Sequence, residues 1–419
     1  MRGNENIFQE LWETVDGLPV VDTHEHLTPE SMRVETTGDF FSIALAQYAG
    51  SDLISAGMTP KQLETLLGHE VAFEDKLNIF MPFWEKVSNT AYSRVLAVAA
   101  RGLYDIDEIS RESLPELNKR VAEKNKPGLY KEILQDKCRI KYCLWDQSFT
   151  GYPKKDDFFR LSLRLDDIVF VNSAEDIKSL EHKYNVSISS PEGLEEIMEV
   201  RISNNKPRGL TAIKTALAYN RTLHFETVSR AEAVLSMDHI LRNRFTEADV
   251  KILQDYMMNS LMLKAFWHNL TIQVHTGLQE GSGNVIYHAN PALLSTLVSN
   301  HPATRVDLFH GGYPYGGELS AMAKMFPNVY IDMAWLHVIS PSFVRRYLPE
   351  WLDTVPVSKL MGFGGDYTFV EGVYGHLQLA KENITCVLAD KVADGVFTMT
   401  DAKRYAKMML YENPDSLFM

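Results

Sequence analysis

Two histidines, one residue apart, stand at the end of a short apolar stretch near the start of the chain. Residues 18–23 are rich in β-branched side chains and predict a buried strand, which leads directly to His24 and His26. Side chains alternate between the two faces of a strand, so both imidazoles point one way and Glu25 the other. Zinc and its first-row neighbours bind neutral imidazole together with carboxylate where a catalytic site keeps a position open for water. The motif therefore predicts half of a metal site, and a surface or packing role is the alternative.

Three more residues able to bind a metal or move a proton follow later apolar segments. His275 ends IQVH, His310 ends DLFH before two glycines, and Asp366 follows two glycines in MGFGGD. Taken singly, each has a plain structural explanation, as a core histidine bonded to a carbonyl or as an aspartate in a turn or helix N-cap. Taken together, their repeated position at the end of a strand predicts one shared site.

The segments that carry these residues belong to a regular alternation of strands and helices. Besides the first strand, apolar strand-like segments occur at 139–144, 159–170, 210–217, 270–276, 305–310, 328–333 and 359–363. Most are separated by segments long enough for a helix, such as 247–266 and 291–300. Strand and helix alternating eight times is typical of a (β/α)8 TIM barrel, in which the active site lies at the carboxyl ends of parallel strands. The third strand is the one whose register the sequence leaves open.

One long segment does not fit this alternation. Residues 40–136 show helical periodicity, interrupted at Gly57, Gly68 and Gly102, and they are too many for a simple connection after the first strand. We expect a helical insertion that packs over the mouth of the barrel as a cap. With no internal repeat and no low-complexity linker, residues 1–419 are interpreted as one barrel domain that contains this insertion.

The amino-acid composition limits the kinds of molecule that the protein is expected to bind. The formal net charge of −13 argues against a nucleic-acid surface, which requires clustered Lys and Arg. No apolar run reaches the length of a membrane span, and the polar, acidic start predicts no secretory signal. Three cysteines, Cys138, Cys143 and Cys386, show no paired spacing, which suits a reducing compartment. These features predict a cytoplasmic protein that acts on a small molecule.

The combination VDTHEH, IQVHTG, LFHGGYP followed by FPNVYIDMAW, and GFGGDY resembles the metal-dependent amidohydrolase superfamily, in particular its amidohydrolase-related (amidohydrolase 2) branch. The resemblance implies that His24, His26 and His275 are metal ligands. It implies that Asp366 is a ligand that also accepts a proton from the metal-bound water. It further implies that His310 polarises the substrate or shuttles a proton.

This assignment agrees with the chemistry of the residue types. A divalent ion lowers the pKa of its bound water from about 15.7 toward 7, which generates hydroxide at neutral pH. Asp366 can then accept a proton and pass it to the leaving group, while the ion and His310 stabilise the oxyanion. One ion is expected, zinc first, with manganese, iron or nickel as alternatives.

Lys214, in the fourth strand, leaves the metal count open. Some members of the superfamily carboxylate a lysine on this strand and use it to bridge two metals. Lys214 could do this, could bind an acidic substrate, or could be a buried lysine shifted toward neutrality. A second metal is therefore an alternative to the single ion.

Substrate contacts are less well indicated. Arg221, just beyond the fourth strand, could grip a substrate carboxylate with its planar guanidinium, and a solvated loop arginine is the alternative. Tyr313 and Trp335 are aromatic residues near the predicted rim, where they line a pocket or pack beneath a loop.

Together these features predict a metal-dependent hydrolase that cleaves an amide, lactone or similar bond in a small, carboxylate-bearing substrate. The alternatives are a metal-dependent decarboxylase of a small unsaturated or aromatic acid and an enzyme similar to uronate isomerase. A non-catalytic metal-binding barrel is the alternative from a different class. A homo-oligomer is expected by analogy with related barrels.

Overall fold

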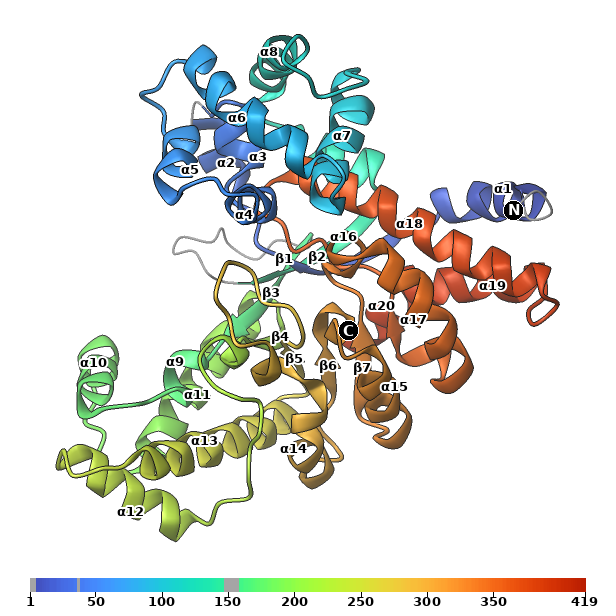
Figure 1. Ribbon diagram of the computed structural model, residues 1–419. Coiled ribbons are helices and arrows are strands. Elements are labelled where there is room, and N and C mark those ends of the chain that lie inside the picture. Colours follow the sequence, from blue (N-terminus) through green and yellow to red (C-terminus); the bar gives the residue numbers. More distant parts are fainter. Residues whose placement is uncertain (1–4, 36–37, 147–157) are drawn as a thin grey trace.

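The chain forms a ring of parallel strands surrounded by helices (Figure 1). The computed structural model describes residues 5–35, 38–146 and 158–419. Eight strands pair in sequence order, each parallel to the next. The strands are β1 (Val20–Glu25), β2 (Ile140–Asp146), β3 (Phe159–Arg164), β4 (Leu210–Thr215), β5 (Thr271–Val274), β6 (Val306–Leu308), β7 (Val329–Asp332) and β8 (Leu360–Met361).

The ring closes between its first and last strands. Thr23 of β1 donates its backbone N–H and its hydroxyl to the carbonyl of Phe363, just beyond β8, at 3.2 and 3.0 Å. The predicted (β/α)8 barrel is thereby confirmed. The last strands are shorter than the apolar segments that predicted them, because the residues after them leave the ladder and form the loops that carry the site.

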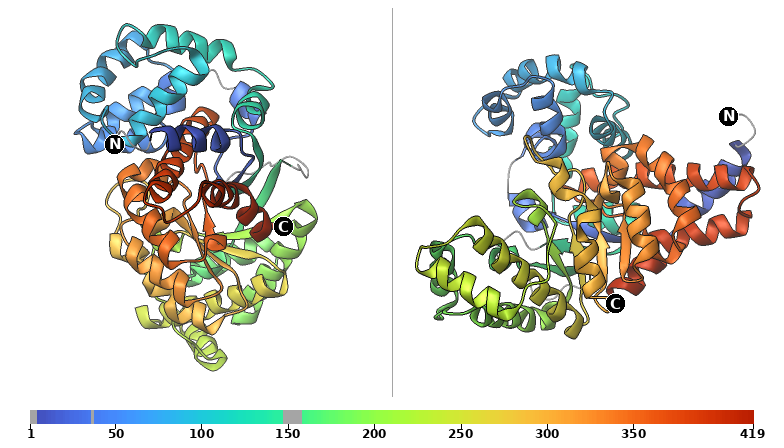
Figure 2. Two further views of the ribbon diagram at one scale, coloured as in Figure 1. Left: turned by 90° about the vertical axis from the view of Figure 1, so that its right-hand side faces the viewer. Right: turned by 60° about the horizontal axis from the view of Figure 1, so that its bottom comes forward.

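A helical cap fills the connection between β1 and β2, and we use this name for the helices of residues 30–137. Its helices begin with the local signals expected for helix starts, such as the capping box of Thr59 and Gln62 with Pro60 in the first turn. The cap helices form a layer on one side of the barrel (Figure 2). They are α2 (Glu30–Glu35), α3 (Phe40–Ala44), α4 (Tyr48–Ser55), α5 (Pro60–Leu67), α6 (Phe73–Val87), α7 (Ala91–Tyr104), α8 (Leu114–Lys124) and the π-helical η1 (Lys131–Lys137).

The remaining helices enclose the barrel. They are α1 (Glu5–Asp16), α9 (Asp166–Val169), α10 (Ala174–Tyr184), α11 (Pro191–Asn205), α12 (Arg230–Leu241), α13 (Glu247–Trp267), α14 (Ser295–Asn300), α15 (Gly316–Met325), α16 (Leu336–Ile339), α17 (Pro341–Thr354), α18 (Val370–Ala393), α19 (Met399–Lys407) and α20 (Asn413–Phe418). Helix α18 packs against α1, α7 and α17, so it joins the cap to the barrel. Within the described ranges, no helix has the length and apolar character needed to cross a membrane.

Candidate active site

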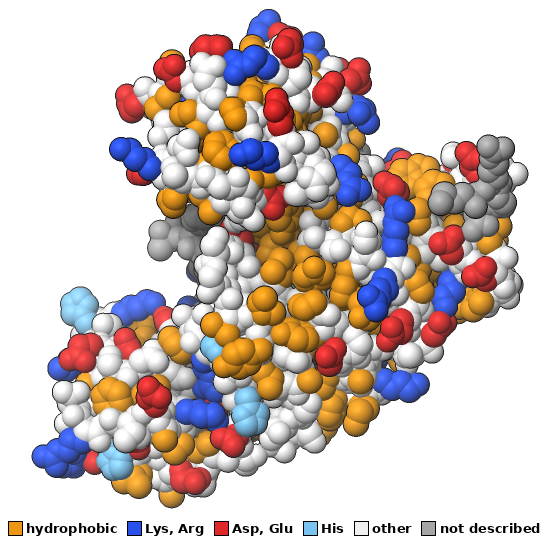
Figure 3. All heavy atoms as spheres, in the orientation of Figure 1, with side chains coloured by type: hydrophobic (Ala, Val, Ile, Leu, Met, Phe, Trp, Pro, Cys, Tyr) orange, Lys and Arg blue, Asp and Glu red, His pale blue; other side chains and the backbone are white. Residues whose placement is uncertain are grey.

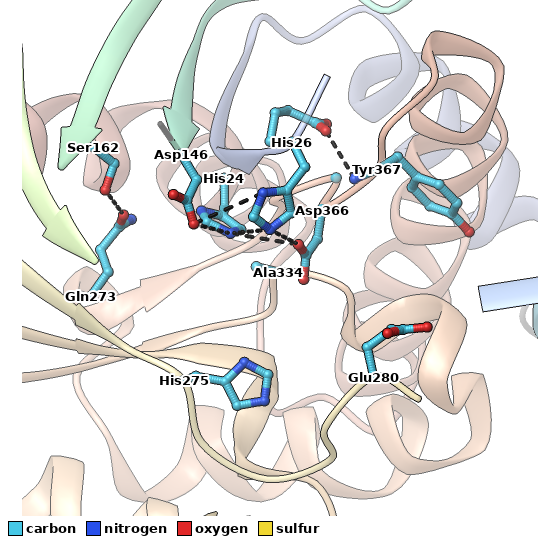
Figure 4. A network of polar contacts seen from close by, with 12 residues as sticks. His24, His26, Asp146, Ser162, Gln273, His275, Glu280, Ala334, Asp366 and Tyr367 are labelled. Atoms are coloured by element: carbon cyan, nitrogen blue, oxygen red, sulfur yellow. Dashed lines mark hydrogen bonds and ion pairs between the residues drawn. The ribbon is translucent and has the colours of Figure 1, made fainter. Parts of the chain in front are cut away.

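His24 of β1, His26 just after β1 and Asp366 after the last strand meet at the carboxyl end of the barrel (Figure 4). The Nε2 atoms of His24 and His26 are 3.2 Å apart. Asp366 Oδ1 lies 3.5 Å from the Nε2 atom of His24 and 3.1 Å from that of His26. Three potential ligand atoms thus form a small triangle.

The size of this triangle fits a metal ion. Ligand bonds of about 2.0–2.1 Å around tetrahedral zinc place neighbouring ligand atoms roughly 3.3 Å apart, close to the three separations found here. A second carboxylate is farther away, since Asp146 Oδ2 lies 3.9 Å from nitrogens of His24 and His26. The same oxygen accepts from Nε and Nη2 of Arg164, at 2.7 and 2.6 Å. Asp366 is therefore the better placed of the two carboxylates to complete the triangle.

The backbone around Asp366 is strained and closely packed. Asp366 adopts a left-handed conformation, with φ of 61°, which costs a non-glycine residue about 1–3 kcal/mol. The preceding glycines allow the loop to approach β1, because a Cβ at Gly365 would lie 1.8 Å from Glu25 Oε1 and one at Gly364 would lie 2.5 Å from Thr23 Oγ1. Close packing against β1 therefore requires glycine at both positions before Asp366.

Burial alone would raise the pKa of Asp366. The hydrogen bond and charge of His26, with smaller contributions from His310 and Lys214, outweigh burial and hold that pKa below its usual value. The carboxylate is thus ionised at neutral pH and can serve as a ligand or as a base.

His275 and His310 form a second imidazole pair, from the ends of β5 and β6. His275 Nε2 donates to the carbonyl of Leu278 at 2.8 Å, and His310 Nδ1 donates to that of Ala334 at 2.9 Å. Burial lowers the pKa of both rings well below the usual value, so both are neutral. Their other nitrogens then carry lone pairs, which face each other at 3.0 Å. If one of these two nitrogens took up a proton, it would donate an N–H···N hydrogen bond to the other. His310 Nδ1 also lies 3.8 Å from Asp366 Oδ2, which links the two pairs.

Lys214 lies on β4 and is 1% exposed. Its amine has no hydrogen-bond partner among the described residues and lies 3.6 Å from the centre of the Phe309 ring. Burial lowers its pKa to about 8. A substantial neutral fraction is therefore available near physiological pH.

A pair of buried acids lies behind the first-strand histidines. Burial raises the pKa of Asp22 to about 6, and burial together with the neighbouring charge of Asp22 raises that of Glu25 well above its usual value. Asp22 Oδ1 accepts from the backbone N–H groups of His24 and Gly365, at 3.2 and 3.0 Å. Glu25 Oε2 accepts from the N–H of Tyr367 at 3.0 Å. The pair thus ties the loop of the last strand to the first strand.

A second acid pair lies in the barrel interior. Burial raises the pKa of Asp307 to about 7, and burial together with the charge of Asp307 raises that of Asp332 well above its usual value. Gln273 continues this polar layer, since it accepts from the hydroxyl of Ser162 at 3.0 Å and donates to the carbonyl of Thr23 at 3.0 Å (Figure 4). Barrel interiors usually contain branched apolar side chains at such positions.

A cavity of about 710 Å³ opens onto the site. Figure 3 shows the molecule hollowed between the cap and the helices α9–α13. The cationic side chains of the lining are Arg164, Arg201 and Lys214. Arg201 is held in place by Asp167 Oδ1 at 2.6 Å and by the carbonyl of Arg164 at 2.7 Å. The remaining lining residues are His24, His26, Ala46, Gln47, Tyr48, Asp166, Asp167, Ala216, Tyr219, Asn220, His275, Glu280, Trp335, Asp366 and Thr368.

The two predicted aromatic residues have different positions. Trp335 lines the cavity in a left-handed conformation, with φ of 60°, and its ring stacks on Tyr48 at 4.5 Å. Its indole N–H is buried and has no partner within the described residues. Tyr313 lies outside the lining and packs edge-on against Phe343 at 5.0 Å. Trp335 is thus the aromatic residue available to a substrate.

Arg221 also lies outside the lining. Its guanidinium donates to Asp255 Oδ1 at 2.6 Å and Gln254 Oε1 at 2.9 Å, and to the carbonyls of Thr222 and His224. These internal partners occupy the guanidinium, so the arginines that face the cavity are instead Arg164 and Arg201.

Sequence reasoning missed five residues of the site region. Asp146 and Arg164 end β2 and β3, but the sequence predicts an end of the second strand at residue 144 and leaves the register of the third open, so the strand-end rule does not find them. Arg201 lies within α11, while Gln47 and Tyr48 begin α4, and no sequence pattern marks any of them.

Comparison with known proteins finds a family match for the C-terminal part of the chain. The family model described as Amidohydrolase matches residues 252–414, which include His275, His310 and Asp366. The predicted resemblance to the amidohydrolase superfamily is therefore confirmed.

Similar proteins include both sequence relatives and solved structures. Protein fluG of Emericella nidulans is 29% identical over 151 residues, which cover 36% of this chain and only 17% of that protein. Uronate isomerase from Thermotoga maritima superposes with a TM-score of 0.81 at 17% identity, over 98% of this chain and 97% of that one. A Lactobacillus casei protein, named as a candidate metal-dependent hydrolase, has a TM-score of 0.67 at 21% identity, over 97% of both chains. At these identities the two structures establish a shared fold.

Proposed function

We propose that this protein is a metal-dependent hydrolase that cleaves an amide, lactone or similar bond in a small, carboxylate-bearing substrate. The observation that carries this proposal is the triangle of His24, His26 and Asp366, with separations of 3.2, 3.5 and 3.1 Å. The neutral His310 beside Asp366 supplies a group that can take up a proton during turnover.

His24, His26 and Asp366 would hold the ion, and zinc, manganese, iron or nickel suits this ligand set. When bound, a divalent ion supplies Lewis acidity, which lowers the pKa of water toward neutrality and polarises a carbonyl group. A second ion would need Lys214 as a carboxylated ligand, as the family resemblance allows.

The chain's own residues supply the proton transfers. Asp366 is ionised, and Oδ2, the oxygen turned toward His310, accepts the proton of the attacking water. His310 keeps its Nδ1–H on the Ala334 carbonyl, so its Nε2 is the atom that takes up or releases a proton. His275 Nδ1, 3.0 Å away, accepts a hydrogen bond from that Nε2 once it is protonated.

Two arginines in the cavity lining support an anionic substrate. Nη1 of Arg164 makes no hydrogen bond to any described residue, and Arg164 and Arg201 both line the cavity. A guanidinium can bind a carboxylate with two parallel hydrogen bonds.

Isomerisation of a sugar acid is the second candidate. The likeness to uronate isomerase extends over 98% of the chain, and therefore includes the cap, which lies outside the family match to residues 252–414. A cavity whose lining includes two arginines also suits a sugar acid.

Isotopic labelling separates these reactions. The metal-loaded protein would be incubated with N-acyl amino acids, lactones and sugar acids, in ¹⁸O-labelled water and separately in D₂O. Hydrolysis predicts one ¹⁸O atom in the product acid. Deuterium in the carbon skeleton without bond cleavage would instead establish isomerisation, and release of carbon dioxide would establish decarboxylation.

A further inference from the structure

The backbone of residues 365–368, which carries Asp366, has a hydrogen-bond partner at every N–H and C=O group. Gly365 N–H donates to Asp22, Asp366 N–H to the His24 carbonyl, Tyr367 N–H to Glu25 and Thr368 N–H to Gln47. The carbonyls of Gly365, Asp366, Tyr367 and Thr368 accept, in order, from His376, from Gln47 and Tyr48 together, from the N–H of His26 and from the N–H of Thr28. Such complete pairing specifies one conformation for the segment.

The partners divide between the barrel and the cap. β1, the residues just after it and helix α18 provide most of them, but the Asp366 carbonyl and the Thr368 N–H depend on Gln47 and Tyr48. Gln47 Nε2 donates to the Asp366 carbonyl at 3.0 Å, while its Oε1 accepts from the Thr368 N–H at 3.0 Å and from the Thr368 hydroxyl at 3.3 Å. Tyr48 donates its hydroxyl to the same carbonyl at 2.5 Å.

These contacts act on a strained residue. Asp366 has φ of 61°, and left-handed backbone is unfavourable for a residue with a Cβ. Two donors on its carbonyl fix the plane of the following peptide group. Because Oδ1 of Asp366 must remain about 3 Å from His26 Nε2 to share an ion with it, a rotation of this backbone would remove the carboxylate from the triangle.

The cap also holds its own two residues in place. Gln47 and Tyr48 stand at the start of α4, and the Tyr48 ring packs against the rings of Trp335, at 4.5 Å between centroids, and of Tyr92, at 5.2 Å. These two ring contacts restrict the direction of the Tyr48 hydroxyl.

We propose that Gln47 and Tyr48 are positioning residues through which the cap holds Asp366 in its ligand geometry, so that the metal site is complete only when the cap is docked. This inference rests on the proposed metal site and does not depend on which reaction the site performs. Neither side chain reacts; both act through the backbone of Asp366.

Zinc affinity of the full-length chain tests the proposal. We would measure competition with a chromophoric chelator for wild type, Gln47→Ala, Tyr48→Phe and the control Tyr92→Phe. The control removes a hydroxyl from the same group of packed aromatic rings, but no hydrogen bond to residues 365–368 involves Tyr92.

Changes in groups that orient ligands typically weaken metal binding about 10- to 100-fold, so we expect a loss of zinc affinity in this range for Gln47→Ala and a smaller loss for Tyr48→Phe. Tyr92→Phe should bind zinc as tightly as wild type.

Hydrogen exchange of the metal-free proteins provides a second measurement. The peptide that covers residues 364–369 should exchange faster in Gln47→Ala than in wild type, whereas Tyr92→Phe should leave its exchange unchanged. Wild-type zinc affinity and wild-type exchange in both Gln47→Ala and Tyr48→Phe would overturn the proposal. A wild-type protein that binds no zinc would overturn the proposed metal function instead, and the exchange data would still decide whether Gln47 holds this segment.

Discussion

The β1–β8 side of the site carries His24 and His26 from the end of β1 and Asp366 from the loop after β8, whereas the β5–β6 side carries His275 and His310 from the ends of β5 and β6. The two sides differ in what their polar atoms contact. His24 and His26 turn their Nε2 atoms toward Asp366. His275 and His310 each use one nitrogen on a backbone carbonyl and turn the other toward each other. The ligand atoms of His24, His26 and Asp366 therefore converge on one point. The facing nitrogens of His275 and His310 can instead share one proton.

The charges differ in the same way. Asp366 is ionised on the β1–β8 side, so a cation there gains an opposite charge. The β5–β6 rings are both neutral because of burial. Under the proposed function, similar residue types at strand ends would therefore serve different purposes, with one side holding an ion and the other transferring a proton.

Replacing Asp366 should have the largest effect. Asp366→Asn removes the ionised ligand and the base together, so zinc binding and turnover should both fall below detection. Elemental analysis and a turnover assay measure this directly. A ligand stabilises the folded state that it binds, so a chelator should lower the melting temperature of wild type and leave that of the variant unchanged. Tight zinc binding by Asp366→Asn would contradict the assignment of metal binding to the β1–β8 side.

His310→Asn should separate proton transfer from metal binding. Loss of a positioned acid or base typically costs about 10²–10⁴-fold in rate, and we expect a decrease of this size in turnover with the metal content unchanged. Unchanged turnover would show that the β5–β6 side has no role in proton transfer.

His275→Ala tests whether His275 is a metal ligand. The family resemblance implies that His275 is a ligand, but its open nitrogen lies 3.0 Å from His310 Nε2. We therefore expect His275→Ala to weaken zinc binding less than His26→Ala does, as measured by chelator competition. Equal losses in the two variants would place His275 among the full ligands.

The smallest effect concerns the acid pair beneath the β5–β6 side. The pKa of Asp307 is raised to about 7 by burial, so between pH 4 and 7 the folded state keeps a proton that the unfolded state loses. This contribution makes the free energy of unfolding fall as pH rises through that window, by a few kcal/mol at most, on the order of 1.4 kcal/mol per pH unit. Asp307→Asn cannot lose this proton, so its stability should fall less between pH 4 and 7, as measured by urea unfolding. A parallel pH dependence of stability in wild type and variant would contradict the raised pKa of Asp307.

The strand-end rule explains why much of the site could be predicted from sequence. His24, His26, His275, His310 and Asp366 follow strands whose apolar residues are read easily, and parallel strands of a barrel bring their carboxyl ends to one place. Arg164 could not be placed, because the sequence around its strand allows several registers.

Other residues could not be predicted because their partners lie far away in sequence. Arg221 has the type and position of a substrate ligand, but Asp255 and Gln254, from α13, occupy its guanidinium. Gln47 and Tyr48 act on Asp366 through a contact between the cap and the barrel, which no local pattern reveals.

The most direct test of the account is the metal content of the purified protein. We would measure it by elemental mass spectrometry, without a metal-affinity tag, for wild type, His24→Ala and His310→Asn. The account predicts about one first-row metal ion per chain in wild type, as expected of a mononuclear site, with the ion lost in His24→Ala and retained in His310→Asn. Wild-type protein that binds no metal after reconstitution, or His24→Ala protein that retains it, would contradict the account.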